Sequence, residues 1–348
     1  MSEAQTRPYG LAIVGAGIIG ANIAHRAATA GLDCLVLDQS VPGNGASRPS
    51  VGLSLPYGRS PLVRQYADFS RSFYDQLRTE YRWDLDAVGV CGAQHFDEVG
   101  ERFCSPITDD HRLQRREVEH VAGFEISAGR EEAYFRIPAC HRALPYRIAE
   151  QLLAESNATV WEGVRVEKLV LKKSGKELLL ADGRSINAST VVVATGPWLP
   201  QSLALAGAKA NGVRVKKVVA FNIDVEPIGS APLVYFFDED AFLVPDRQHG
   251  RWLFSITSEA WDVTPDVSSL AISPADRSAA LTILDRYAPA LKSKMNSGRV
   301  FCDAYTTDRV PMVQTVADRT VACGAANGSG YRLAPGLAEH AVRLALSL

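Results

Sequence analysis

The sequence predicts a mixed α/β fold, in which a Rossmann-like domain on a parallel sheet is joined to a second domain built on a large antiparallel sheet. Two short apolar runs, residues 11–14 and 34–37, are typical of buried parallel strands, and the first leads directly into a glycine-rich turn. Residues 213–257 instead contain three segments that alternate polar and apolar side chains. A period of two indicates an antiparallel sheet with one covered face.

The glycine-rich turn has the spacing of a dinucleotide-binding site. Gly15 allows a tight turn, Gly17 allows the backbone to approach a pyrophosphate, and Gly20 allows a helix extending to about residue 30 to pack closely on the strand. Phosphate would then meet free amides and the positive end of the helix dipole. Asp38, at the end of the second run, is placed to bind the ribose hydroxyls, and it would repel a 2′-phosphate, which disfavours NADP.

Composition narrows the class of protein. The chain has 348 residues with a net charge of −2, and its basic residues are scattered, so no nucleic acid partner is expected. No stretch reaches about 18 uninterrupted apolar residues and the N-terminus is polar, which predicts a cytoplasmic protein without a membrane span. Six cysteines without CxxC spacing predict no disulfide framework. His95, His111, His120 and His141 lack ligand spacing, and no metal is expected.

Periodicity and breaker residues predict the remaining elements. Helices are expected over 61–80, 114–121, 145–156, 274–288 and 335–346, the fourth with Ser273 as its N-cap. Strands are expected over 164–170, 177–181, 185–186, 190–194, 214–225, 233–244, 251–257 and 320–323. One domain would comprise residues 1–80, 140–213 and 297–348, and the other residues 81–139 and 214–296.

Four blocks of the sequence resemble the FAD-dependent D-amino-acid oxidase superfamily, which includes glycine and sarcosine oxidases. They are the turn 15–20 with Asp38, the loop 45–47, residues 191–198 and residues 328–336, and together they span nearly the whole chain. The resemblance implies non-covalent FAD, a small-molecule amine or amino acid substrate oxidised at its C–N bond, and O2 or another electron acceptor. A homo-oligomer is compatible with it. The residues implied to contact FAD are Gly15, Gly17, Ile18, Ile19, Gly20, Asp38, Gln39, Gly45, Ala46, Ser47, Leu53, Val166, Thr195, Gly196, Gly328, Ser329, Gly330, Tyr331 and Arg332.

The chain departs from this family where the substrate would bind. In the amino-acid oxidase branch an Arg precedes a Tyr-Thr-x-Asp segment by two residues, whereas here Tyr305 follows Asp303. In the sarcosine oxidase branch a Lys of the last block holds the carboxylate, and Arg332 stands at the matching place. We therefore expect Arg332 to anchor an anion, Asp303 to face a cationic or hydroxyl part of the substrate, and Tyr305 and Tyr331 to lie beside them. Alternatively, Asp303 and Arg332 pair with each other.

Two further expectations concern the flavin. The amides of residues 328–332 and a helix beginning at Pro335 would stabilise negative charge that develops on the ring. Cys302 lies one position from the site of covalent attachment in the sarcosine oxidase branch, so we expect non-covalent FAD, with a covalent thioether as the alternative. Residues 218–291 contain no counterpart of that branch's oxygen-activating Lys, which leaves the electron acceptor open. Two alternatives are a flavin-binding electron-transfer subunit of a larger complex and an NAD-dependent dehydrogenase.

Overall fold

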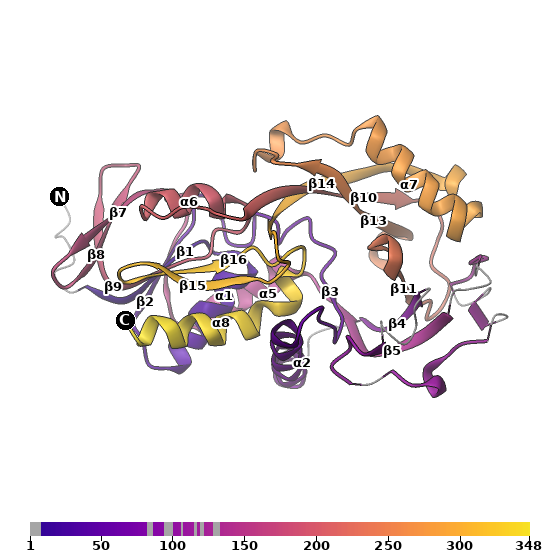
Figure 1. The fold of residues 1–348 in the computed structure, drawn as a ribbon, viewed down its shortest axis with the longest axis horizontal. Helices are drawn as coiled ribbons and strands as arrows, with labels where there is room; N and C mark the ends of the chain where they lie inside the picture. Colours follow the sequence, from indigo (N-terminus) through magenta and orange to yellow (C-terminus); the bar gives the residue numbers. More distant parts are fainter. Residues whose placement is uncertain are drawn as a thin grey trace.

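Two sheets lie side by side along the longest axis of the molecule in the computed structural model (Figure 1). It describes residues 8–81, 86–93, 100–105, 107–114, 117–118, 122–127 and 133–348. Each sheet contains eight strands within these residues, and the chain crosses between the sheets several times. None of the helices in these ranges combines the length and apolar character that crossing a bilayer requires.

Sheet A has a parallel core in the order β16-β9-β1-β2-β6, which confirms the Rossmann-like arrangement. These strands are β1 (Tyr9–Val14), β2 (Cys34–Leu37), β6 (Thr159–Trp161), β9 (Ser185–Val193) and β16 (Thr320–Gly324). The antiparallel strand β15 (Met312–Ala317) closes one edge, and the hairpin β7 (Val166–Lys172) and β8 (Gly175–Leu180) attaches to β9. One face of the sheet packs on α1 (Ile18–Thr29), α5 (Pro145–Glu155) and α8 (Gly330–Leu346), with α2 (Pro61–Tyr81) against α8; the other face packs on α6 (Leu199–Leu205).

Sheet B is antiparallel apart from one parallel pair, β11 with β4. Its order is β14-β10-β13-β12-β11-β4-β5-β3. The strands are β3 (Leu53–Ser54), β4 (Asp86–Ala93), β5 (Ala133–Arg142), β10 (Val213–Ile223), β11 (Leu233–Phe236), β12 (Ala241–Asp246), β13 (Arg251–Trp261) and β14 (Met295–Thr306). Helix α7 (Pro274–Tyr287) covers one face, and the sequence expectation of a mixed α/β fold with a large antiparallel sheet is confirmed.

Several element boundaries differ from the sequence expectation. The two strands expected within 185–194 are one, β9, because its first half pairs with β8 and its second half with β1 and β16. The segment 233–244 is a hairpin, since the chain turns through Asp240 with a φ of +48°. Strand β14 was not expected. The helix expected at 114–121 lies mostly outside the described residues. The proposed division into domains stays a prediction. Strands β3 and β14 both belong to sheet B, although the expected boundaries put β3 and most of β14 in the first domain.

The N-terminus of α7 follows the expected capping pattern. Ser273 Oγ accepts a hydrogen bond from the Asp276 amide at 3.2 Å, and the Asp276 carboxylate accepts one from the Ser273 amide at 2.7 Å. Asp276 is also buried against Lys217 Nζ at 2.7 Å. Although burial alone would raise it, these hydrogen bonds from Lys217, Ser258 and Ser273 hold the pKa of Asp276 at about 2. The cap therefore also fixes α7 on sheet B.

Helix α8 begins five residues earlier than expected, so that Pro335 lies inside it. A proline has no N–H, and its ring cannot pack against the carbonyl one turn earlier, which here belongs to Tyr331. The Tyr74 hydroxyl of α2 donates to that carbonyl at 2.8 Å, and the next amide, Gly336 N–H, donates to Ser70 Oγ of α2 at 3.0 Å. Two side chains of α2 thus satisfy the backbone groups that Pro335 disrupts, which makes the early helix start possible.

Replacing Ser70 by alanine tests this arrangement. Ser70→Ala leaves the buried Gly336 amide unpaired and should lower the free energy of unfolding by about 1–3 kcal/mol in urea denaturation. The matched control is Ser72→Ala on the exposed face of the same helix, where the lost bond is only to the Asp68 carbonyl and the change should stay within about 0.5 kcal/mol. Equal losses in the two variants would contradict this account of α8.

Candidate active site

A cavity of about 1140 Å³ lies between the two sheets. It is bordered by the carboxyl ends of β1 and β2, the loop 44–59, the face of sheet B opposite α7, and the start of α8. Every residue expected to contact cofactor or substrate lines this cavity except Gly20. Segments about 300 residues apart in the sequence therefore meet at one site, as the four separated sequence blocks predict.

The glycine turn at the start of α1 leaves backbone amides facing the cavity. Gly15 has a φ of +108°, and a side chain there would strike the Ala194 carbonyl of the neighbouring strand end. The Ile18 amide donates to Ser47 Oγ at 3.0 Å, whereas the amides of Gly17 and Ile19 have no protein partner in the described structure. Such amides, at the positive end of a helix dipole, are suited to a phosphate group.

Gly20 does not line the cavity, and its role as a cofactor contact stays a prediction. A Cβ atom at this position would overlap the Gly15 carbonyl oxygen. The missing side chain therefore lets α1 pack closely on β1 and sets the shape of the turn without facing the ligand space.

Asp38 joins the end of β2 to the glycine turn. Its carboxylate accepts hydrogen bonds from the Ala16 amide at 2.7 Å and from the Ser40 amide at 2.8 Å. Burial raises its pKa despite these two bonds. Each carboxylate oxygen has a further lone pair, and the side chain lines the cavity, so Asp38 can hold the turn and still accept from ligand hydroxyls.

The first turn of α8 supplies a second set of amides. Those of Gly330, Tyr331 and Arg332 have no partner within the described residues, and all three positions line the cavity. The Tyr331 side chain points into the core instead: its ring stacks on Tyr74 at 4.8 Å, and its hydroxyl lies 2.9 Å from His141 Nε2. Burial lowers the pKa of His141 to about 4, so this imidazole is neutral.

Arg332 and Asp303 line the cavity without pairing with each other. Arg332 donates to the Tyr57 carbonyl at 2.5 Å and to Ser329 Oγ at 2.7 Å, and no carboxylate lies within ion-pair distance of it in the described structure. Burial lowers its pKa. Asp303 accepts from the Ala304 amide at 2.8 Å and the Gly328 amide at 3.2 Å. Burial raises the pKa of Asp303 to about 6.

Tyr305 completes this part of the cavity wall. Its ring packs edge-on against Trp261 at 5.6 Å, beneath the Arg309 guanidinium. The hydroxyl reaches the Gly328 backbone closely enough that a side chain at Gly328 would collide with it. Cys302, one residue before Asp303, is buried and does not line the cavity, because neighbouring side chains of a strand point to opposite faces. Non-covalent attachment of the cofactor stays a prediction.

Within the described part of the chain, two buried polar atoms of the cavity wall have no hydrogen-bond partner: Thr195 Oγ1 and Tyr57 Oη. Orphaned groups of this kind are rare unless a ligand or water completes them. Together with the two amide clusters and the size of the cavity, they fit a large ligand with a diphosphate and several hydrogen-bonding edges, which is the chemistry of FAD. The described residues contain no group of three His, Cys, Asp or Glu side chains that could hold a metal ion, and His95 and His120 lie outside them.

Sequence reasoning missed two residues that line the cavity, Tyr57 and Asp240, and one that lies behind it, Lys216. Tyr57, whose carbonyl holds Arg332, lies in a loop without a motif. Asp240 lines the cavity and accepts from the Tyr235 hydroxyl at 2.6 Å. Lys216 stands opposite Asp303 in the pairing of β10 with β14, buried 4.7 Å from the Trp261 ring. No local sequence pattern marks Tyr57 or Asp240, and the position of Lys216 opposite Asp303 depends on the pairing of β10 with β14.

This fold and this site define an FAD-dependent oxidoreductase. Residues 11–344 match the model of the DAO family, FAD dependent oxidoreductases, and the chain belongs to that family. The NAD-dependent alternative is therefore wrong.

Comparison with known proteins agrees with this assignment. The chain is 26% identical over 349 residues to the tRNA 5-methylaminomethyl-2-thiouridine biosynthesis bifunctional protein MnmC of Caulobacter vibrioides, covering 97% of this chain and 54% of that protein. It thus spans about half the length of this curated relative. Among solved structures, L-proline dehydrogenase from P. horikoshii superposes with a TM-score of 0.82 at 18% identity, covering 97% of this chain and 93% of the other. Glycine oxidase from Geobacillus kaustophilus has a TM-score of 0.78 at 19% identity, with 98% and 95% covered. At these identities, the structures show the shared fold.

Asp38→Ala should weaken FAD binding at least about tenfold, because the turn loses its acceptor for two amides and the ligand loses a charged partner. Titration of the apoprotein with FAD, followed by flavin fluorescence, measures the dissociation constant. Glu162→Gln is the matched control, since it removes a nearby exposed carboxylate that accepts no bond from the turn. Identical constants for Asp38→Ala and the native protein would remove Asp38 from the cofactor site.

Proposed function

We propose that this protein oxidises the C–N bond of a small amine or amino acid. One observation carries the proposal: Arg332 and Asp303 have opposite charges, line the same cavity as the two amide clusters, and are not paired with each other. An amino acid or substituted amine carries a carboxylate and a basic or polar group that suit these two partners. The neighbours that share the fold include a glycine oxidase and a proline dehydrogenase, which supports the same class of substrate.

The residues of the chain bind and orient the substrate. FAD supplies the acceptor for the electron pair of the C–H bond beside nitrogen. Arg332 binds the substrate carboxylate with the donor capacity left beside its two protein acceptors, and the Tyr57 carbonyl fixes the guanidinium plane. The free amides at the start of α8 stabilise negative charge that develops on the bound cofactor. Asp303 contacts a cationic or hydroxyl part of the substrate. The imine product is hydrolysed by water.

A second candidate is favoured by one observation, the match to MnmC over 97% of the chain. The name of that relative includes a methylaminomethyl group on a tRNA base, which also contains a C–N bond. The substrate of the present chain would then be a modified nucleoside within tRNA. The net charge of −2 favours the small-molecule candidate, because tRNA binding draws on clustered positive charge. An electron-transfer subunit of a larger complex is a third alternative.

Anaerobic reduction of the bound flavin separates these candidates. The purified, FAD-loaded chain is mixed with D- and L-amino acids, N-methyl amino acids, imino acids and total tRNA, and flavin bleaching is recorded. Bleaching by a small amine or amino acid supports the proposal. Bleaching by tRNA alone favours the second candidate, and no bleaching by any of them, with normal reduction by dithionite, favours an electron-transfer role. Admitting O2 afterwards then shows whether oxygen is the acceptor.

Arg332→Ala should raise the KM of the best carboxylate substrate by at least about tenfold, because a charged hydrogen-bond pair is lost, while the flavin stays bound. Arg309→Ala, which removes another cavity-lining arginine, is the matched control and should change the KM less. Steady-state kinetics and the flavin spectrum report both quantities. An unchanged KM in Arg332→Ala would refute its role as the carboxylate anchor.

The ionisation of Asp303 should appear in the pH dependence of KM. Because burial raises its pKa to about 6, the carboxyl group is neutral below that pH and charged above it. The KM for a substrate with a cationic group should therefore fall as pH rises through about 6. Asp303→Asn should abolish this change at constant flavin content. A profile that keeps the same inflection in the variant would assign it to another group.

A further inference from the structure

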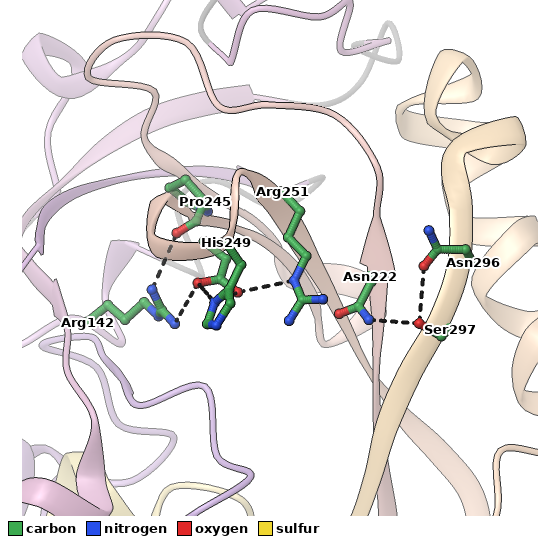
Figure 2. Close-up of polar contacts among 8 residues, drawn as sticks. Arg142, Asn222, Pro245, His249, Arg251, Asn296 and Ser297 are labelled. Carbon is green, nitrogen blue, oxygen red and sulfur yellow. Dashed lines mark hydrogen bonds and ion pairs between the residues drawn. The ribbon is translucent and has the colours of Figure 1, made fainter.

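A cluster of charged side chains lies on sheet B outside the site described above. The arginine cluster, as we name it, comprises Arg142 of β5, Asp246, His249 and Arg251 of the β12–β13 hairpin, and Arg299 of β14. Asp246 is its only carboxylate among these five residues. It lies 3.3 Å from Arg251 Nε, 3.0 Å from His249 Nδ1 and 3.9 Å from Arg142 Nη2. Figure 2 shows Arg142 and Arg251 on opposite sides of His249, and dashed lines lead from each of them to the carboxylate of Asp246 between them.

Positive charge exceeds negative charge in this cluster by two, with His249 counted as neutral. Although burial alone would raise it, the hydrogen bond from His249 and the charge of Arg142 hold the pKa of Asp246 below its ordinary value, so the carboxylate is ionised at neutral pH. Among the five residues of the arginine cluster, one carboxylate stands against three guanidinium groups. Arginine does not deprotonate in proteins, and a site of this kind therefore attracts an additional anion.

Arg299 offers donors for such an anion. Its Nε and Nη2 atoms are buried and have no hydrogen-bond partner within the part of the chain that the structure describes. Burial and the neighbouring charges of Arg142 and Arg251 lower its pKa, and the charge of Asp246 opposes this shift. A buried guanidinium with two unused donors is costly, and cores avoid it unless an acceptor completes it.

The cluster borders the cavity. Arg299 stands two residues before Phe301 on β14, on the same face, and Phe301 lines the cavity. Across the sheet, Arg299 is in register with Ala220 and, through it, with cavity-lining Ser255. Arg142 donates from Nε to the carbonyl of Val51, which also lines the cavity, at 3.3 Å. A ligand in the cavity thus needs only about 7 Å along the strand to pass from Phe301 to Arg299.

We propose that the arginine cluster binds a phosphate or carboxylate group at the end of the substrate remote from the oxidised C–N bond. Planar guanidinium forks bind such oxyanions bidentately, and the two unused donors of Arg299 match that need. The inference rests on the proposed function and deepens it: the substrate is a small amine with a distal oxyanion. Arg332 and the arginine cluster then hold the two ends of one molecule.

Direct binding tests the site without turnover. Inorganic phosphate is titrated into the full-length, FAD-loaded protein by calorimetry, in a buffer free of other oxyanions. Arg299→Met should weaken phosphate binding at least about tenfold, because a charged, bidentate partner is lost. Arg184→Met is the matched control: it removes one positive charge from the β8–β9 turn of sheet A and should leave phosphate binding unchanged. Equal binding in Arg299→Met and native protein, or no binding in either, would overturn the proposal.

Thermal unfolding separates a ligand role from a structural one. Without phosphate, Arg299→Met should melt at or above the native temperature, because a buried charge without an acceptor has been removed. Phosphate should raise the melting temperature of the native protein and not that of the variant. A variant that melts lower at every phosphate concentration would make Arg299 a structural residue and overturn the inference. Should Arg299→Met not fold, Arg299→Lys, which keeps the charge without the fork, replaces it in both measurements and should also bind phosphate more weakly.

A substrate series tests the distal group itself. N-methyl amino acids of increasing chain length are compared as pairs with and without a terminal carboxylate, and N-methyl amino acids with a terminal phosphate form a further arm that distinguishes the two oxyanions. In the native enzyme the terminal oxyanion should lower KM at least about tenfold at little change in kcat, and this advantage should vanish in Arg299→Met. Oxidation without any preference for the oxyanion, or response to tRNA alone, would overturn the proposal. If no amine is oxidised while phosphate still binds through Arg299, the proposed function fails and the anion site stands.

Discussion

The constraint on which this structure depends is a set of backbone amides, at the starts of α1 and α8, that have no partner among the described residues. The first turn of any helix leaves N–H groups unpaired, and both α1 and α8 direct theirs into one cavity. The parallel core of sheet A makes this unavoidable: β1, β9 and β16 are neighbours that run in the same direction, so the segments following them emerge at one edge. An anionic cofactor with a diphosphate at one end and an electron-rich ring at the other matches both sets of donors.

The start of α8 must satisfy two opposing requirements, because its first amides face the cavity and a proline lies inside the helix. The helix must begin at Gly330 for its amides to reach the cavity, although Pro335 would ordinarily stand in a first turn. Tyr74 and Ser70 of α2 supply the missing backbone partners, and Gly336 lets the two helices approach until a Cβ would touch the Tyr66 backbone. Helix α2 therefore supports the cofactor site indirectly: its hydrogen bonds to α8 lie in the core, and they stabilise the first turn of α8, whose amides face the cavity.

Local chemistry explains which features the sequence predicted. The β1–α1 turn and Asp38 lie within thirty residues of each other in the sequence. Only glycine readily adopts the backbone conformation found at Gly15, so the turn is recognisable from its glycine spacing. The direction of the Tyr331 ring and the contact of Arg332 with the Tyr57 carbonyl depend instead on residues more than 180 positions away. Strand β14 was missed for a physical reason: Phe301 and Tyr305 lie on the same cavity-facing side as Asp303, so apolar residues occur on both faces of the strand and its period of two is not visible in the sequence.

The two faces of sheet B differ in chemistry: one packs in the apolar core and the other faces the cavity. Its outer face, with Phe221, Trp252 and Phe254, packs against α7 in a hydrophobic core, and this apolar burial stabilises the sheet. Its inner face carries Asp303 and Arg299, and Arg332 of α8 lines the same cavity as Asp303. Burial raises the pKa of Asp303 and lowers those of Arg332 and Arg299. Each shift is a free-energy cost in the protein alone, which bound ligand groups of opposite charge would offset. The outer face, by contrast, is stabilised by apolar packing within the fold.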